Sequence, residues 1–204
     1  MKQRKLVVIS SGLSQPSSTR LLADQLTRGA EQAAARLGVT LDVRVIELRD
    51  LAHEITDHML TGFAPTALNQ AQEAVAAADA LITVTPVFSA SYSGLFKSFF
   101  DVLDKDALVD KPVLLAATAG TARHSLVLEH ALRPLFAYLR ASILPTAVFA
   151  ASDDWGADSA EGPLRGRIDR AAAELAREVD RREPAAVVDP FALTTDFEDM
   201  IKNL

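Results

Sequence analysis

The chain has 204 residues, of which 49% are hydrophobic and 24% are charged, and its formal net charge is -6. These values are typical of a globular protein in water, and the length fits one domain better than two. The sequence contains no cysteine, which excludes disulfides, thiolate metal sites and a cysteine nucleophile. The acidic balance disfavours a nucleic-acid partner.

The N-terminus carries basic residues followed by an apolar run over residues 6–9. That run is too short for the hydrophobic core of a signal peptide. No apolar stretch approaches the roughly 18 residues that a membrane-spanning helix needs. We therefore expect a cytoplasmic protein with no membrane association.

Apolar runs rich in β-branched residues alternate with helical patterns along the chain. In chain order, the patterns predict a strand at 5–10, a helix at 22–37, a strand at 41–48, a helix at 67–78, a strand at 80–85, a helix at 95–103, a strand at 113–118, a helix at 128–139, a strand at 143–150 and a helix at 168–179. The strand at 41–48 alternates apolar and polar residues, which indicates a place near a sheet edge. Pro134 removes a backbone donor, so the fourth helix is expected to kink there.

Five successive βα units predict an α/β fold. The simplest topology is a flavodoxin-like, doubly wound, five-stranded parallel sheet in the order 2-1-3-4-5, with helices on both faces. This domain is expected to occupy residues 1–182, and residues 183–204 form a C-terminal tail. A helical face of the tail carries Phe197, Met200, Ile201 and Leu204, which either packs on its own domain or docks on a second subunit.

In such a fold the ligand lies outside the carboxyl ends of the strands. The loop after the first strand is rich in hydroxyls, with Ser11, Ser17, Ser18 and Thr19 leading into a helix N-terminus that favours an anion. It lacks both the lysine of a P-loop and the glycine pattern of a dinucleotide site. A neutral cradle suits the phosphate of a mononucleotide such as FMN; the alternative is a serine-rich turn with Ser17 or Ser18 as N-cap.

The loop after the third strand contributes a second set of candidates: Pro86, Val87, Phe88, Ser91 and Tyr92. Pro86 stiffens the chain, and the two aromatic rings can flank a planar group while backbone amides face its edge. The alternative is that both rings are lids on the core.

The loop after the fourth strand contributes the third set: Thr118, Ala119, Gly120, Thr121 and His124. Gly120 permits close backbone approach, and hydroxyl and cationic donors lie beside it. If the mononucleotide is FMN, we expect residues 118–121 on the side of the flavin ring where negative charge develops on reduction. His124 is either a helper there or a capping or solvated histidine.

Two other site types are disfavoured. No aspartate ends the first or third strand, which argues against a phospho-acceptor receiver site. His53 and His58 lie near Glu54 and Asp57, but two zinc-binding histidines on a helix need a spacing of four. We therefore interpret this segment as a solvated loop and expect no metal.

Together the segments 11–19, 85–97 and 118–124 resemble the NAD(P)H-dependent FMN reductases of flavodoxin-like fold. The resemblance covers about residues 5–180, and the middle segment is its most specific part. Residues 129–136 look like the subgroup that supplies reduced flavin to luciferase-like monooxygenases. The resemblance implies hydride transfer from NADPH or NADH to FMN, delivery to a separate monooxygenase or to oxygen, and a homodimer or homotetramer formed through the helices at 95–103 and 128–139.

Hydride transfer of this kind needs no catalytic side chain, because the cofactor carries the chemistry. Many members of the family have an arginine at the position of Gln15. Arg20 could supply that charge instead. Alternatively, neutral donors and the helix dipole could bind the phosphate without it.

Three other functions remain open at this point. An enzyme of the same fold could retain FMN and reduce quinones or azo dyes. A flavodoxin-type electron carrier would bind FMN tightly and react poorly with NAD(P)H, although the apolar helices at 95–103 and 128–139 argue mildly against it. A non-catalytic protein could bind a phosphorylated ligand at the same loop.

Overall fold

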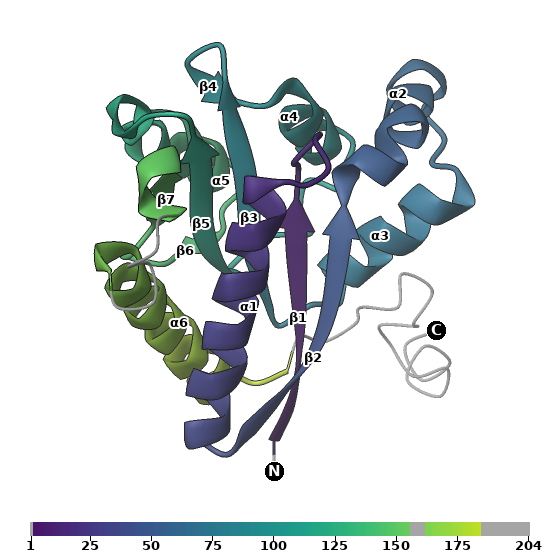
Figure 1. The fold of residues 1–204 in the computed structure, drawn as a ribbon. Helices are drawn as coiled ribbons and strands as arrows, with labels where there is room; N and C mark the ends of the chain where they lie inside the picture. The colour runs from purple at the N-terminus through teal and green to yellow at the C-terminus, as the bar shows by residue number, and fades with distance from the viewer. Residues whose placement is uncertain (1, 156–161, 185–204) are drawn as a thin grey trace, which may run out of the picture.

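The computed structural model describes residues 2–155 and 162–184. Its centre is a parallel sheet whose long strands are β2 (Val39–Glu47), β1 (Lys2–Ser10), β3 (Ala80–Phe88) and β5 (Pro112–Ala119), in that order across the sheet. Beyond them, β6 (Ser142–Ile143) and β7 (Val148–Ala151) both pair with β5. This arrangement confirms the predicted fold class, and β2 lies at the edge as its alternation predicted (Figure 1).

The sheet differs from the prediction in two details. A short strand, β4 (Ser91–Tyr92), turns back and pairs antiparallel with the end of β3. The predicted single strand over 143–150 is wrong, since it is broken between β6 and β7. Pro145 has no N–H to donate, and the N–H and hydroxyl of Thr146 donate to the Glu174 carboxylate at 2.9 and 2.7 Å instead of to a strand.

Helices cover both faces of the sheet (Figure 1). One face carries α1 (Ser18–Arg36) and α6 (Pro163–Arg181); the other carries α2 (Ala52–Thr61), α3 (Thr66–Ala76), α4 (Gly94–Asp101) and α5 (Arg133–Tyr138). Short 3-10 turns occupy Leu48–Leu51, Ala122–His124 and Ser152–Trp155, and a π-helical turn occupies Leu128–Leu132.

The segment that contains both candidate metal-binding histidines forms a helix. The prediction of a solvated loop there is wrong: α2 is anchored by Ile55, which is fully buried in the apolar core, while His53 is exposed. A single buried apolar side chain, with Leu51 half-buried before it, suffices to hold this helix on the core, and such sparse periodicity is a weak sequence signal.

The helix predicted at 128–139 changes geometry near Pro134. The N–H of Arg133 donates to the carbonyl of Leu128 five residues earlier, and α5 begins at Arg133 with Pro134 in its first turn. A proline is tolerated at that place because the first N–H groups of a helix have no intrahelical acceptor.

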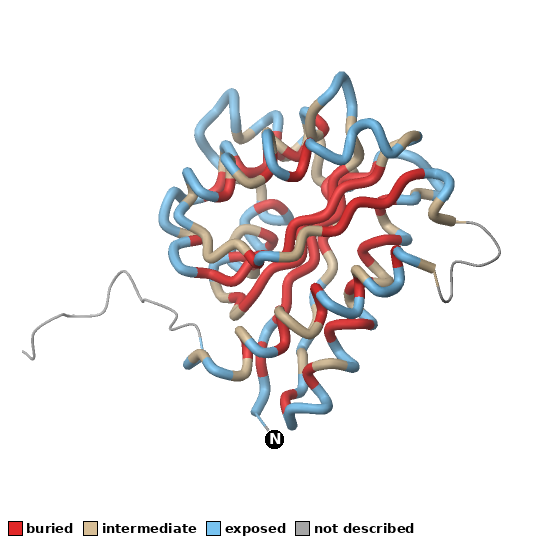
Figure 2. The backbone as a smooth tube through the Cα atoms, turned by 90° about the vertical axis from the view of Figure 1, so that its left-hand side faces the viewer, coloured by how far each residue is buried: buried red, intermediate tan, exposed pale blue. Residues whose placement is uncertain are grey.

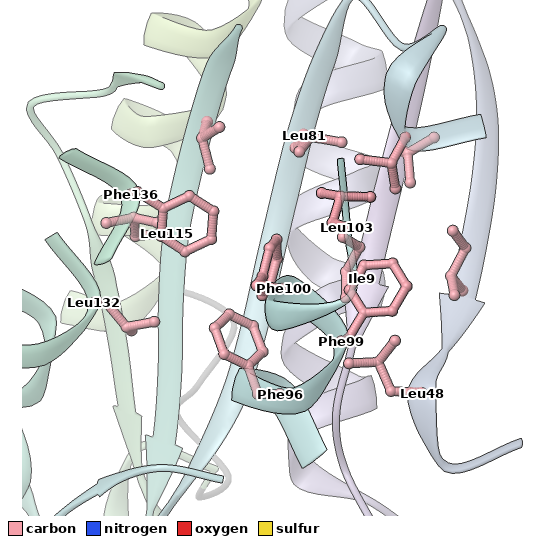
Figure 3. Close-up of a cluster of buried hydrophobic side chains, with 14 of the residues drawn as sticks. Ile9, Leu48, Leu81, Phe96, Phe99, Phe100, Leu103, Leu115, Leu132 and Phe136 are labelled. Atoms are coloured by element: carbon pink, nitrogen blue, oxygen red, sulfur yellow. The ribbon is translucent and has the colours of Figure 1, made fainter. Parts of the chain in front are cut away.

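Two apolar layers sandwich the sheet, so that the strands form the buried centre of the molecule (Figure 2). The layer beneath α2–α5 is the more aromatic, with Phe96, Phe99, Phe100 and Phe136 packed against Ile9, Leu81 and Leu115 of the strands (Figure 3). The layer beneath α1 and α6 is built from smaller alanine, valine and leucine side chains.

The C-terminal tail predicted to carry Phe197, Met200, Ile201 and Leu204 lies outside the described residues, which end at Pro184. Among the described residues the last helix is α6, which ends at Arg181; the domain boundary at residue 182 stays a prediction. No helix within the described ranges is long and apolar enough to span a bilayer.

A buried lysine closes the end of α3. The amine of Lys111, which is 7% exposed, donates to the carbonyls of Val75 and Ala76 at 2.5 and 2.8 Å. Burial lowers the pKa of this amine from 10.5 to about 8, and Asp79 opposes that shift. Between these two values the unfolded chain binds more protons at this site than the folded chain, so stability gained from Lys111 rises with pH.

We expect the free energy of unfolding to rise by about 2–4 kcal/mol more in the wild type than in Lys111→Met between about pH 7.5 and about pH 10. Methionine retains the apolar stem but cannot titrate. Urea unfolding of both proteins across this range measures the difference. Equal pH slopes in the two proteins would contradict the buried, titrating amine.

Candidate active site

A cavity of about 330 Å³ opens at the carboxyl ends of the parallel strands. Its volume is in the range of small-molecule sites. It is lined by Gly12, Leu13, Ser14, Ser18, Thr19, Pro86, Val87, Phe88, Thr118, Ala119, Gly120 and Ser152. These residues form the ends of β3 and β5, follow β1, β5 and β7, or begin α1, and their meeting at one edge is what a parallel sheet produces.

The first loop ends in a capped helix. The hydroxyl of Ser17 accepts a hydrogen bond from the N–H of Arg20 at 3.2 Å, so Ser17 is the N-cap of α1. Ser18 and Thr19 follow as the first helical residues, whose N–H groups have no intrahelical acceptor. In the described part of the chain, the N–H groups of residues 12–15 donate to no protein acceptor either. The loop therefore presents a cluster of free backbone donors.

Gly12 is required by the tight closure of this loop. A Cβ atom at this position would lie 2.0 Å from the Ser17 hydroxyl oxygen and 3.1 Å from the Cβ of Thr19. The Ser17 hydroxyl cannot turn away without losing its capping bond to α1. Glycine thus lets the loop fold back on the helix N-terminus.

Hydroxyl contacts hold the loops together below the cavity. Thr19 and Thr118, both buried, share a hydrogen bond of 2.9 Å that joins α1 to the end of β5. Ser11 is fully buried and donates to the Val84 carbonyl at 3.3 Å, while the hydroxyl of Ser93 donates to Ser11 at 3.3 Å. Ser11 therefore serves the framework and does not line the cavity.

The segment predicted as the loop after the third strand forms the end of β3 and the short strand β4, and its candidate residues divide between cavity and core. Pro86, Val87 and Phe88 line the cavity, and Phe88 is 46% exposed. Tyr92 instead packs on the core, with its ring centroid 5.9 Å from that of Phe96. This placement favours the alternative interpretation of Tyr92 as a lid on the core, and Ser91 does not line the cavity either.

The candidate residues at the end of β5 and in the loop that follows it divide in the same way. Thr118, Ala119 and Gly120 line the cavity, whereas Thr121 accepts a hydrogen bond from the N–H of Arg123 at 3.4 Å and caps the turn that follows. His124 is exposed at the end of that turn and does not line the cavity.

The charge of Arg20 is directed away from the cavity. Its guanidinium pairs with Asp24 at 2.7 Å and with Glu47 at the end of β2. The hydrogen bond to Asp24 makes the larger contribution and the hydrogen bond to Glu47 the smaller one, and both raise the pKa of Arg20. Two carboxylates already neutralise the charge of Arg20, so Arg20 is a poor substitute for an arginine at position 15.

Comparison with known proteins agrees with this geometry. The sequence model of the family described as NADPH-dependent FMN reductase matches residues 4–156, three quarters of the chain. The chain belongs to this FMN reductase family. The membership confirms the predicted enzyme class, an oxidoreductase, and the pairing of FMN with NADPH or NADH.

Relatives of this FMN reductase extend over most of its length. An FMN reductase (NADPH) of Pseudomonas aeruginosa is 43% identical over 175 residues, covering 84% of this chain and 90% of the relative. The NADH-dependent FMN reductase SfnE of Pseudomonas putida is 42% identical over 176 residues, covering 84% and 89%. The crystal structure of an oxidoreductase from Corynebacterium diphtheriae superposes with a TM-score of 0.85 at 48% identity, covering 90% of this chain and 100% of the other.

The lining of the cavity is chemically compatible with FMN. The free N–H groups of residues 12–15 and the start of α1 are donors of the kind that bind a phosphate, and the closure at Gly12 brings the loop against the N-terminus of α1. The half-buried Pro86 and Val87 and the exposed Phe88 offer apolar surface for a planar ring. No carboxylate lines the cavity among the described residues.

Four cavity-lining residues of the reductase were missing from the sequence-based candidates. Leu13 and Ser14 lie within the first loop, and Ser152 follows β7. The signal for Ser152 was available, because the carboxyl end of the fifth strand meets the same sheet edge as the others. Gly12, the fourth addition, was visible only as part of the family segment 11–19.

Proposed function

We propose that this protein transfers a hydride from NAD(P)H to FMN, and that the loop at residues 12–19 holds the FMN phosphate. The observation that carries this assignment is the cluster of free N–H groups at residues 12–15, adjoining the N-terminus of α1. An anion there gains hydrogen bonds and a favourable dipole without any lysine or arginine in the loop.

We assign the flavin ring to the remaining lining of the cavity. Pro86, Val87 and Phe88 supply apolar contact, and residues 118–120 face the ring edge with backbone donors. When bound, FMN accepts the hydride from NAD(P)H and supplies the redox chemistry itself. The residues of this chain bind and orient the ring, and the open mouth of the cavity admits the nicotinamide. No acid or base is assigned.

Of the earlier candidates, Ser11, Ser17 and Thr121 are proposed to act through the framework, since each hydroxyl already serves a loop or a cap. Ser18, Thr19, Pro86, Val87, Phe88 and residues 118–120 are proposed as direct contacts. Ser91, Tyr92 and His124 keep no proposed contact with FMN.

We further propose that the reduced flavin passes to a separate monooxygenase and that the protein forms a homodimer or homotetramer. Support for self-association comes from residues 126–138, where Leu126 is 62% exposed and Tyr138 is 84% exposed. Sedimentation in solution tests this, and a monomer would contradict it. The cytoplasmic location stays a prediction.

The decisive assay follows the absorbance of reduced nicotinamide with and without added FMN. We expect consumption of NAD(P)H to depend on added FMN and to saturate with it. Full activity on a benzoquinone without added FMN would indicate a quinone or azo reductase that retains its flavin. Tightly bound FMN with slow NAD(P)H oxidation would indicate an electron carrier, and no consumption at all would indicate a phosphate-ligand binder.

A further inference from the structure

The first loop contacts one cation from outside its own sequence. Arg49 lies in the turn Leu48–Leu51 that follows β2. The register pairs Glu47 of β2 with Ser10 of β1, so this turn lies beside the loop that begins after Ser10. The guanidinium of Arg49 donates to the carbonyl of Leu13 at 3.3 Å. Within the described ranges, no other guanidinium or ammonium group donates a hydrogen bond to residues 12–15.

The orientation of one peptide group links this contact to the cavity. The C=O and N–H of a trans peptide point in opposite directions, and the peptide between Leu13 and Ser14 is trans. Because its C=O faces Arg49, its N–H, which belongs to Ser14, points away from Arg49. Ser14 lines the cavity, and its N–H donates to no described residue.

The charge of Arg49 is only weakly compensated. Its nearest carboxylate is that of Asp50 at 3.5 Å, and the Asp50 side chain is 69% exposed, whereas that of Arg49 is 29% exposed. An exposed pair at that separation is strongly screened by solvent. Arg20, by contrast, has two carboxylate partners at its guanidinium.

We propose that Arg49 is a positioning residue for the FMN phosphate, and this inference rests on the proposed function. Its charge-assisted donation to the Leu13 carbonyl polarises the Leu13–Ser14 peptide, which strengthens the Ser14 N–H as a phosphate donor. The same contact fixes that N–H on the side of the peptide that faces away from Arg49. Arg49, which lies behind the loop, thereby supplies the positive charge that an arginine at position 15 would supply.

Binding of FMN and of riboflavin separates this role from simple support of the fold, because riboflavin lacks the phosphate. We expect Arg49→Gln to weaken FMN binding by about 5- to 20-fold and riboflavin binding by less than about 2-fold. Arg49→Lys should recover most of the FMN affinity. Arg28→Gln, which removes an equal charge from the exposed side of α1, is the matched control and should change neither.

Titration by flavin fluorescence at two salt concentrations completes the test. FMN binding should depend less on salt in Arg49→Gln than in the wild type. If Arg49→Gln left the ratio of FMN affinity to riboflavin affinity unchanged, because both affinities fell in parallel or because neither fell, the role of Arg49 alone would be overturned. A wild type that binds FMN and riboflavin equally would instead overturn the phosphate assignment itself, and the role of Arg49 with it.

Discussion

Replacement of Ser18 by aspartate is expected to weaken FMN binding about 100-fold or more, because a like charge next to a phosphate costs several kcal/mol. Ser18 is exposed, lines the cavity and is the first residue of α1. The fold should tolerate the change, since an acidic side chain in the first turn interacts favourably with the helix dipole. If the variant remains stable but no longer binds FMN, the loss would therefore be due to the negative charge placed beside the phosphate.

Asparagine at the same position is the matched control, because it has nearly the shape of aspartate without its charge. We expect Ser18→Asn to bind FMN within about tenfold of the wild type and Ser18→Asp to bind riboflavin far better than FMN. Calorimetric titration of both flavins, with thermal unfolding of each variant, gives the comparison. Equal FMN affinities in the two variants would contradict a phosphate near Ser18.

The fold followed from the sequence because its signals are local and redundant. The strands β1, β3 and β5 contain continuous apolar runs, β2 alternates apolar and polar residues, and the buried faces of α1 and α6 repeat at helical spacing. The exceptions have local causes. The β3–β4 hairpin turns at Ser89 and Ala90, with φ of 48° and 69°, and neither residue is the asparagine or glycine that marks such a turn in a sequence.

The location of the site was equally predictable, since topology alone brings the carboxyl ends of the strands together. The role of each hydroxyl group could not be predicted in this way. Ser17 and Ser18 are neighbours of the same type, yet one caps α1 and the other faces the cavity. Thr19 and Thr118, 99 residues apart, share a buried hydrogen bond that no sequence spacing indicates. Such pairings depend on tertiary contacts, which residue type and periodicity do not specify.

Truncation of Phe96 to alanine is expected to lower the free energy of unfolding by about 3–5 kcal/mol, the usual cost of removing a large buried ring. Phe96 is fully buried in the layer beneath α4. Its ring lies 4.8 Å from Phe100, 5.9 Å from Tyr92 and 6.2 Å from Phe136, measured between centroids. Urea unfolding monitored by circular dichroism measures the loss.

The same substitution at Phe63, which is 81% exposed, controls for the chemical change and should alter the free energy of unfolding by less than about 0.5 kcal/mol. Phe96→Ala should also weaken FMN binding, because Tyr92 rests on Phe96 and belongs to β4, which pairs with β3 at Val87 and Phe88 on the cavity wall. A stability loss below about 1 kcal/mol would show that the layer repacks around the gap. A full stability loss with unchanged FMN affinity would show that the hairpin holds Phe88 without support from the core.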